Sequence, residues 1–160
     1  MRILGVDPGL GTTGYGAISA DGRSFRLIEG GIVATRRKDP LEKKLLTLRR
    51  GFGEVIQKCR PEVVILEDLY SHTQHPRTAI LMGHARGVLL SVCSEKQLPV
   101  VHFPAKRVKK AITGNGNATK TQVQEMVTML LRLKQTSCPA DVFDALALAM
   151  SYIYLGNGSR

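Results

Sequence analysis

Runs of apolar residues along the chain predict five strands. Three of these runs follow one another near the start, over residues 2–7, 13–20 and 24–34. The dipeptide Asp21-Gly22 separates the second run from the third and is a strong hairpin signal. Two later runs, rich in β-branched residues, cover residues 62–67 and 98–103. Runs this short and this apolar are typical of strands inside a sheet.

Around the later strands, apolar residues recur at helical spacing. One predicted helix begins after Pro40 and is stopped by Pro61, with basic residues between its apolar positions. Further helices are predicted over residues 77–94, 120–133 and, with Pro139 at the start, about 140–154. Three strands in hairpin series, followed by alternating helices and strands, predict an α/β fold: a mixed five-stranded sheet with helices on both faces.

The chain of 160 residues, 43% hydrophobic, is large enough for one compact domain with a real core. We expect a single domain over residues 1–155 and a short flexible tail at 156–160. No apolar run approaches the roughly 18 residues of a membrane span, and the N-terminus lacks a signal-peptide pattern. Cys59, Cys93 and Cys138 are widely spaced, which predicts a reduced, cytoplasmic protein without a disulfide framework.

The formal net charge of +10 changes this picture, because the basic residues are concentrated in two blocks. Between Arg36 and Arg60 there are nine Lys/Arg against three Asp/Glu, and from Val101 to Ala140 there are seven against Glu125 alone. Such blocks favour a nucleic-acid partner over solvated helix faces, since each neutralised phosphate releases counterions. With no tryptophan and few aromatics, recognition of a duplex-like backbone fits better than stacking along a single strand.

Four carboxylates lie at the ends of predicted elements. Asp7 ends the first strand and Glu67 the fourth, and these two strands are expected to be neighbours in the sheet. Asp141 and Asp144 are three residues apart and share one face of the last helix. Asp141 could also serve as a helix cap, and an acid at the end of a strand can form an ion pair with a basic side chain. If all four converge, their repulsion requires cations, and Mg²⁺ or Mn²⁺ prefers such oxygen ligands.

An acidic metal site on a basic domain suggests a nuclease. Two divalent ions roughly 4 Å apart would activate a water and stabilise the leaving oxygen of a phosphodiester. The glycines after Asp7 could instead cradle a nucleotide phosphate. They lack the GxxxxGK[ST] lysine, however, and no helix follows them directly. We therefore interpret them as a turn that exposes Asp7 and returns the chain into the second strand.

A further motif, GNGNATKTQV, predicts the start of a helix. Asn117 or Thr119 can cap this helix, and Lys120 lies in its first turn. A lysine and free backbone N–H groups at this place suit a phosphate, although a simple helix-start loop is the competing interpretation.

Four segments, GVDPGLGTTGYG, VVILED, GNGNATKTQVQEMV and ADVFDALALA, together resemble the RuvC family of Holliday-junction resolvases. The similarity runs in family order from Ile3 to about Ile153. It implies a ribonuclease H-like fold and a homodimer that nicks a four-way DNA junction symmetrically, leaving 5′-phosphate and 3′-hydroxyl ends. It also implies a role in recombination and repair beside a branch-migration helicase.

The resemblance assigns roles by position. It implies two Mg²⁺ (or Mn²⁺) ions per active site, held by Asp7, Glu67, Asp141 and Asp144. Lys109 and Lys120 fall where the family has basic residues important for DNA contact and cleavage. Further DNA contacts are expected from a basic cluster and one aromatic residue: Lys106, Arg107, Lys110 and Tyr70.

This chain departs from the family pattern at a few positions. Some members have histidine where it has Asp141. Tyr70 stands where phenylalanine is frequent; its ring could stack on an unpaired junction base or anchor its own loop. Asp68 replaces a common glutamine, and strand alternation should turn its side chain away from the face of Glu67.

Three alternatives remain at this point. Actin-like and sugar-kinase ATPases share the core fold and a similar glycine hairpin, but they need two such domains. A catalytically silent junction-binding module would not need all four acids. A related nuclease could act on RNA or on other branched DNA.

The predicted helix 77–94 has one side made of small residues: Ala79, Gly83, Ala85 and Gly87. Small side chains allow another backbone to approach closely, either within the fold or across a dimer. The sequence leaves both possibilities open.

Overall fold

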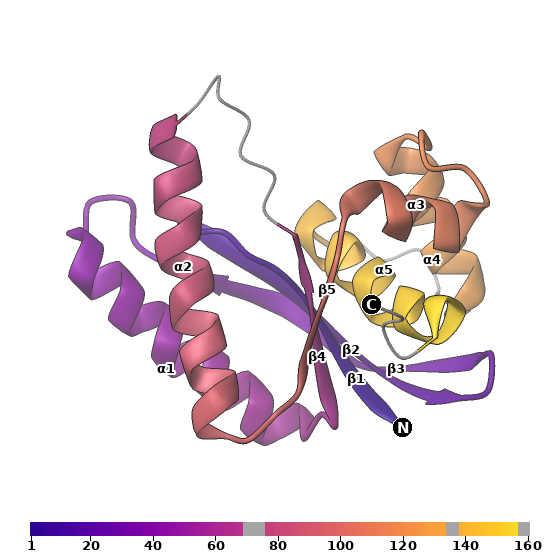
Figure 1. Cartoon of the computed structure of the whole chain (residues 1–160), viewed down its shortest axis with the longest axis horizontal. Coiled ribbons are helices and arrows are strands. Elements are labelled where there is room, and N and C mark those ends of the chain that lie inside the picture. Colours follow the sequence, from indigo (N-terminus) through magenta and orange to yellow (C-terminus); the bar gives the residue numbers. More distant parts are fainter. Residues whose placement is uncertain (69–75, 134–137, 157–160) are drawn as a thin grey trace.

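A computed structural model describes residues 1–68, 76–133 and 138–156. It contains one five-stranded sheet with the strand order β3-β2-β1-β4-β5 (Figure 1). The strands are β1 (Arg2–Asp7), β2 (Thr12–Asp21), β3 (Ser24–Ala34), β4 (Val63–Glu67) and β5 (Val100–Phe103). β1, β2 and β3 pair antiparallel, whereas β4 pairs parallel with both β1 and β5. The predicted mixed sheet is therefore confirmed.

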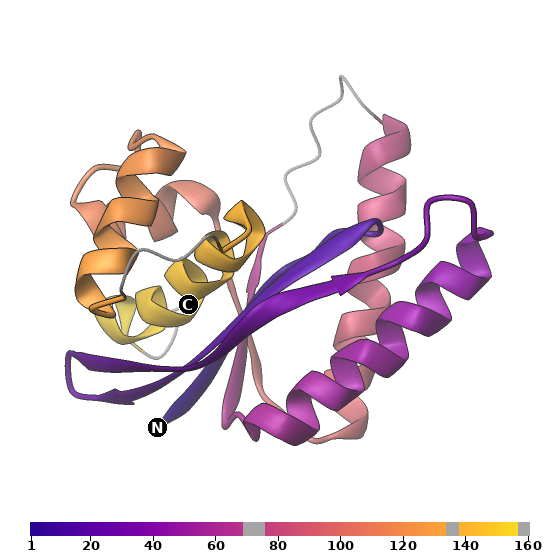
Figure 2. The ribbon, with the colours of Figure 1, turned by 180° about the vertical axis from the view of Figure 1, so that it is seen from behind.

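Within the described ranges, five helices cover the sheet. They are α1 (Leu41–Cys59), α2 (Pro76–Glu95), α3 (Ala105–Thr113), α4 (Lys120–Leu130) and α5 (Ala140–Leu155). Helices α1 and α2 lie on one face, and α3, α4 and α5 lie on the other, as the two opposite views show (Figures 1 and 2). Each face has its own core cluster, with Phe52 and Leu89 buried on the first side and Met150 and Leu146 on the second. Helices on both faces are what the sequence predicts.

Helix α3 was not predicted from the sequence. Its apolar face consists of little more than Val108 and Ile112, one helical turn apart and both buried. The helix follows Pro104 and ends at Gly114, whose φ of 79° is the left-handed conformation that terminates many helices. A proline at the start and a glycine just past the end were the available signals, but four basic residues between them obscured the short apolar pattern.

Glycines allow α5 to lie directly on the sheet. A Cβ on Gly5 in β1 would come within 1.9 Å of the Ala145 carbonyl oxygen, and one on Gly14 in β2 within 2.3 Å of the Asp141 carbonyl oxygen. Both contacts are with backbone atoms, which cannot move aside as the tip of a side chain can. The glycines thus hold the helix that carries Asp141 and Asp144 against the strand that ends in Asp7.

None of the helices in the described part of the chain is long and apolar enough to cross a membrane. Cys59 and Cys93 are both buried. The proposed division into a domain over 1–155 and a tail at 156–160 stays a prediction, because 157–160 lie outside the described residues.

Candidate active site

Asp7 and Glu67 lie side by side at the edge of the sheet that is formed by the carboxyl ends of β1 and β4. β1 and β4 run parallel, with Val6 paired to Leu66 as the last pair of their ladder. The next residues, Asp7 and Glu67, therefore leave the two strands at the same end. This confirms the expectation that the first and fourth predicted strands are neighbours.

Three of the four predicted acids line one cavity of about 250 Å³: Asp7, Glu67 and Asp144. Lys109 of α3 and Lys120 of α4 line it as well. Its apolar wall comes from the three helices on this face: Ala105, Val108, Val123, Ala147 and Leu148. Asp141, in the first turn of α5, does not line the cavity. Its charge nevertheless acts on Asp7, as the pKa of that residue shows.

The pKa of the Asp7 carboxyl is raised from 3.8 to about 7. Burial is the largest cause, followed by the negative charges of Glu67, Asp144 and Asp141, while the Lys120 ammonium lowers it. The pKa of Glu67 is also raised, by burial and then by Asp144, against the lowering effect of Lys120 and Lys109. A cation bound in the cavity would lower the pKa of both carboxyls, because an opposite charge nearby favours the ionised form.

Lys120 supplies part of that positive charge. Its Nζ donates to Asp144 Oδ2 at 3.0 Å, and this contact raises the pKa of Lys120. The lysine begins α4 because Thr119 caps the helix: the Thr119 hydroxyl accepts from the Gln122 N–H, and the Gln122 side chain accepts from the Thr119 N–H. Of the two candidate caps, Thr119 is the one used. The Lys120 side chain remains 71% exposed and keeps the freedom to reach another anion.

The donor chemistry of this cavity suits a divalent metal. Carboxylate oxygens are the ligands that Mg²⁺ and Mn²⁺ prefer, and three carboxylates line this one cavity. The side chains are not drawn together into a preformed cage: no three Asp, Glu, His or Cys residues within the described ranges form a group that could already hold an ion. In this arrangement Asp144 is paired with the Lys120 ammonium.

Arg86 of α2 supports Glu67 from the opposite face of the sheet. Its guanidinium donates to the Glu67 carbonyl oxygen, contacts the His102 ring nitrogen Nδ1 and lies 3.8 Å from Asp68 Oδ1. The Arg86 side chain is only 12% exposed. Asp68 thus pairs toward α2, whereas Glu67 lines the cavity under α3–α5, as strand alternation predicts. Sequence reasoning missed Arg86, and the only signal was a lone arginine in the apolar half of a helix.

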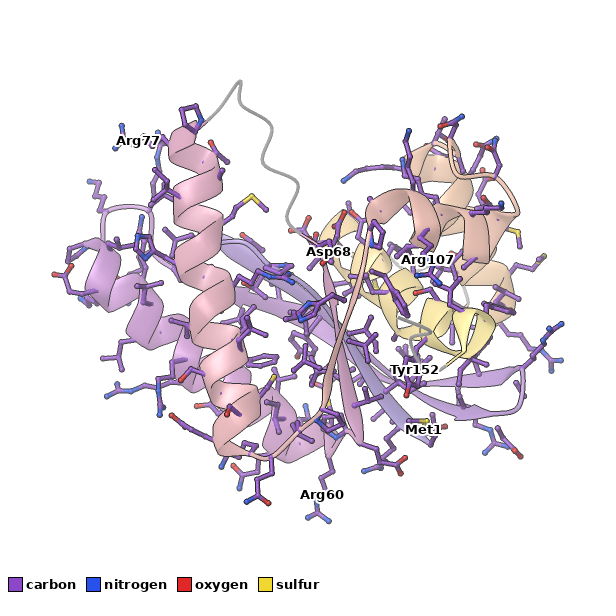
Figure 3. All side chains as sticks on the ribbon, in the orientation of Figure 1. Met1, Arg60, Asp68, Arg77, Arg107 and Tyr152 are labelled. Carbon is purple, nitrogen blue, oxygen red and sulfur yellow. The ribbon has the colours of Figure 1, made fainter. Side chains whose placement is uncertain are left out.

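Three of the remaining predicted DNA contacts lie on α3. Lys106, Arg107 and Lys110 are exposed on α3, and the Arg107 guanidinium lies 5.8 Å from the centre of the Phe103 ring. Arg107 and Asp68 are labelled in Figure 3. Tyr70 lies outside the described residues, so its expected stacking stays a prediction.

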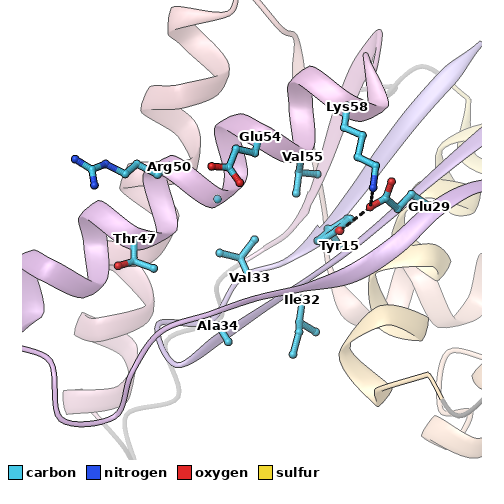
Figure 4. Close-up of a pocket in the computed structure, with 11 residues that line it drawn as sticks. Tyr15, Glu29, Ile32, Val33, Ala34, Thr47, Arg50, Glu54, Val55 and Lys58 are labelled. Atoms are coloured by element: carbon cyan, nitrogen blue, oxygen red, sulfur yellow. Dashed lines mark hydrogen bonds and ion pairs between the residues drawn. The ribbon is translucent and has the colours of Figure 1, made fainter.

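A larger hollow of about 560 Å³ lies between β3 and α1, away from the four acids (Figure 4). Inside it the Tyr15 hydroxyl donates to Glu29 Oε1 at 3.1 Å, and Lys58 donates to the same oxygen at 2.8 Å. The Lys58 ammonium is the largest influence on Glu29 and lowers the pKa of that carboxyl. Because these polar groups satisfy one another, we interpret this hollow as a structural groove and place the chemistry at the smaller, acidic cavity.

The chain is similar to known proteins over nearly its whole length. Residues 3–152 match the model of the family "Crossover junction endodeoxyribonuclease RuvC". A protein of that name from Rhodopirellula baltica is 46% identical over 155 residues, covering 97% of this chain and 87% of its own length.

Solved structures give the same result in three dimensions. Thermus thermophilus RuvC superposes with a TM-score of 0.87 at 31% identity, covering 96% of this chain and 94% of its own. The same protein in complex with Holliday junction substrate gives a TM-score of 0.89 at 31% identity, covering 97% and 94%. The ribonuclease H-like fold implied by the sequence motifs is thereby confirmed. Since the match spans nearly all of both sequences, the chain belongs to the crossover junction endodeoxyribonuclease RuvC family of nucleases.

Proposed function

We propose that the chain resolves four-way DNA junctions in recombination and repair, by paired, symmetric nicks that leave 5′-phosphate and 3′-hydroxyl ends. One observation carries the proposal: three carboxylates and two lysines line a single cavity, at the edge of the sheet where β1 and β4 end. The chain's net charge of +10 suits a polyanionic substrate. The Thermus thermophilus relative, similar over nearly the whole chain, is described in complex with Holliday junction substrate.

The family is one of metal-dependent nucleases, and the acids of the cavity are the natural ligands. Asp7, Glu67 and Asp144, with Asp141 beside them, would hold two divalent ions, Mg²⁺ or Mn²⁺. Bound ions of this kind supply an activated water and neutralise charge on the leaving oxygen. The strands place the backbones of Asp7 and Glu67 side by side, so only their side chains have to turn toward the ions.

The two lysines of the cavity would act on the substrate. Lys109 and Lys120 both face the space occupied by the acids, and Lys120 is largely exposed. We infer that each steadies the scissile phosphate or its developing negative charge. In the absence of substrate, the Lys120 ammonium pairs with Asp144.

A homodimer fits this function, because two protomers related by a two-fold axis match the pseudo-two-fold symmetry of a junction. Helix α2 offers a surface for the contact. Gly83 and Gly87 lie on its exposed side with open space where a Cβ would stand, and Ile80 is 62% exposed beside them. Ala85, by contrast, is buried in the core. The small residues of this helix thus serve two purposes, and we assign the exposed glycines to the dimer contact.

Replacing Gly87 by glutamine should separate the dimer without weakening the fold. The longer side chain would hold two α2 helices apart, whereas a glycine replaced inside a helix usually gains about 0.5–1 kcal/mol of stability. We expect the dissociation constant of the dimer to rise at least about 100-fold, or about 3 kcal/mol. Sedimentation equilibrium measures this constant, with Gly53→Gln as control, since Gly53 lies on α1 and also faces open space. A Gly87→Gln dimer as tight as the wild type would contradict this assignment.

The function itself is tested with a synthetic four-way junction carrying labelled strands. The expected products are paired nicks in opposing strands, in Mg²⁺ or Mn²⁺, with no cutting of a linear duplex of the same arm sequence. Tight binding without cleavage under either metal would leave a junction-binding module. Equal cutting of the plain duplex, or of an RNA–DNA hybrid, would preserve the metal site and overturn the substrate.

The proposal includes the setting of the reaction. A branch-migration helicase as partner and a cytoplasmic location follow from the family resemblance and are tested by co-purification and fractionation. A single nuclease domain over residues 1–155 is part of the same proposal.

A further inference from the structure

The turn between β3 and α1 carries three adjacent cations, Arg36, Arg37 and Lys38. All three are exposed. Within the described part of the chain, none of their side chains makes a hydrogen bond or an ion pair. Three neighbouring cations without counter-charge repel one another, and an anion bound between them would relieve that repulsion.

This turn lies at the same edge of the sheet as the acids. β1 and β3 are both antiparallel to β2, so they run in the same direction, and Ala34 and Asp7 end at the same side. Thr35 ties the turn to the glycine-containing segment that follows Asp7. Its N–H donates to the Gly11 carbonyl oxygen at 2.9 Å, and its hydroxyl donates to the Leu10 carbonyl oxygen at 2.7 Å.

Neighbouring residues hold the turn in one shape. The Lys44 ammonium donates to the Arg37 carbonyl oxygen at 3.0 Å, and the Asp39 N–H donates to the Arg36 carbonyl oxygen at 3.1 Å. The Asp39 carboxylate is itself paired with Lys43 at 3.4 Å. The acid nearest the turn is therefore occupied, and the three exposed cations keep their full charge on a fixed backbone.

The opposite flank of the acids is basic too. β5 runs parallel to β4, and α3 begins just past its end, at Ala105. Lys106, Lys109 and Lys110 therefore stand at the same edge as the acids. In the order of the strands, the basic turn after β3 comes first along this edge, the acids of β1 and β4 follow, and the basic helix α3 comes last.

We propose that Arg36, Arg37 and Lys38 form a second phosphate-binding site, which holds DNA on the side of the acids opposite α3. This inference rests on the proposed function and extends it. A duplex arm seated across the edge would be gripped on both sides of the phosphate that lies over the acids. β1 and β3 are two strand spacings apart, about 10 Å, which corresponds to about three base-pair steps of a duplex. Because Arg36, Arg37 and Lys38 lie on the turn beyond the end of β3 at Ala34, the contacted phosphates would lie at least that far from the nick.

The first test is the salt dependence of junction binding in EDTA, where no cleavage interferes. Replacing all three residues by glutamine (Arg36→Gln, Arg37→Gln, Lys38→Gln) should reduce the slope of log K against log salt by about 2–3. A matched control (Arg26→Gln, Arg60→Gln, Lys96→Gln) removes the same charge from exposed positions at the other edge of the sheet. In Figure 3, Arg60 lies at the bottom of the molecule, well below Asp68. The control should keep the wild-type slope within about 1.

The second test uses wild-type protein and junctions in which single phosphates are replaced by neutral methylphosphonates. Scanned outward from about three nucleotides to one side of the cut, the substitution should weaken wild-type binding several-fold at the contacted phosphates and leave binding by the triple variant unchanged. A triple variant with the wild-type salt slope and the wild-type methylphosphonate profile would overturn the inference. Wild-type cleavage, measured in parallel, separates this failure from a failure of the proposed function, which would show as no paired nicks at all.

Discussion

Replacing Asp7 by asparagine should abolish junction cleavage while leaving junction binding close to that of the wild type. Burial and the charges of all three other carboxylates raise the pKa of Asp7, so Asp7 lies at the centre of the site. Asparagine has nearly the same shape but cannot supply a negative oxygen to a divalent ion. We expect the single-turnover cleavage rate to fall at least about 1000-fold, or about 4 kcal/mol of transition-state stabilisation.

The same substitution should make the metal-free protein more stable at neutral and higher pH. The pKa of Asp7 is about 7 in the folded protein, against 3.8 for the unperturbed group, so the folded state binds the proton more tightly than the unfolded state. The free energy of unfolding therefore declines as the pH rises from about 4 to about 7. Above this range Asp7 is ionised in the folded protein, and the full loss of stability remains. At pH 8 in EDTA, Asp7→Asn should raise the free energy of unfolding by roughly 2–4 kcal/mol.

Urea unfolding at pH 5 and pH 8, with and without Mg²⁺ or Mn²⁺, measures this effect. The gain from Asp7→Asn should be larger at pH 8 than at pH 5, and a divalent ion should stabilise the wild type more than the variant. Glu125→Gln is a suitable control, because Glu125 is an exposed acid on α4. Cleavage by Asp7→Asn at a near wild-type rate would show that Asp7 is not needed to hold the metal. A variant less stable than the wild type at pH 8 would contradict the electrostatic explanation of the pKa shift.

Much of this site could be predicted because it depends on local patterns. The short β-branched runs fixed the position of β4, and an acid at the end of each run marked Asp7 and Glu67. Asp141 and Asp144 follow from helical spacing alone. The meeting of Asp7 with Glu67 needed one topological step, the parallel pairing of β1 with β4, which is the usual outcome once a helix crosses between two strands.

Other features of the site depend on contacts between segments that are distant in the sequence. No repeating pattern of residues predicts such contacts. The donation from Arg86 to the carbonyl oxygen of Glu67 joins residues 19 apart, and the pairing of Lys120 with Asp144 joins residues 24 apart. Lys120 was expected to meet a phosphate, and in the protein alone it meets a carboxylate. The choice of Thr119 over Asn117 as helix cap likewise depends on Gln122, which completes the capping box.

The close contact between α5 and the sheet has a direct consequence for stability. Gly5→Ala would place a Cβ 1.9 Å from the Ala145 carbonyl oxygen and 2.7 Å from the Ala149 N, and both partners are backbone atoms of α5. Neither strand nor helix can yield alone, because Gly5 is in the middle of β1 and α5 is the most buried helix of its face. We expect the substitution to cost about 3 kcal/mol or more, at the upper end of the range for overpacking a core.

The damage should extend to the site, since any shift that relieves the contact moves Asp141 and Asp144 relative to Asp7. The urea midpoint reports the loss of stability, and the single-turnover cleavage rate below the unfolding transition reports the change in geometry. Gly53→Ala on α1 provides the matched control: a Cβ there meets nothing within 4 Å, so alanine should stabilise the helix by about 0.5–1 kcal/mol. A Gly5→Ala protein within about 1 kcal/mol of wild type, cutting junctions at the same rate, would show that α5 is free to move away from the sheet. In that case the glycines would not be what sets the distance between the acids of the helix and the acid of β1.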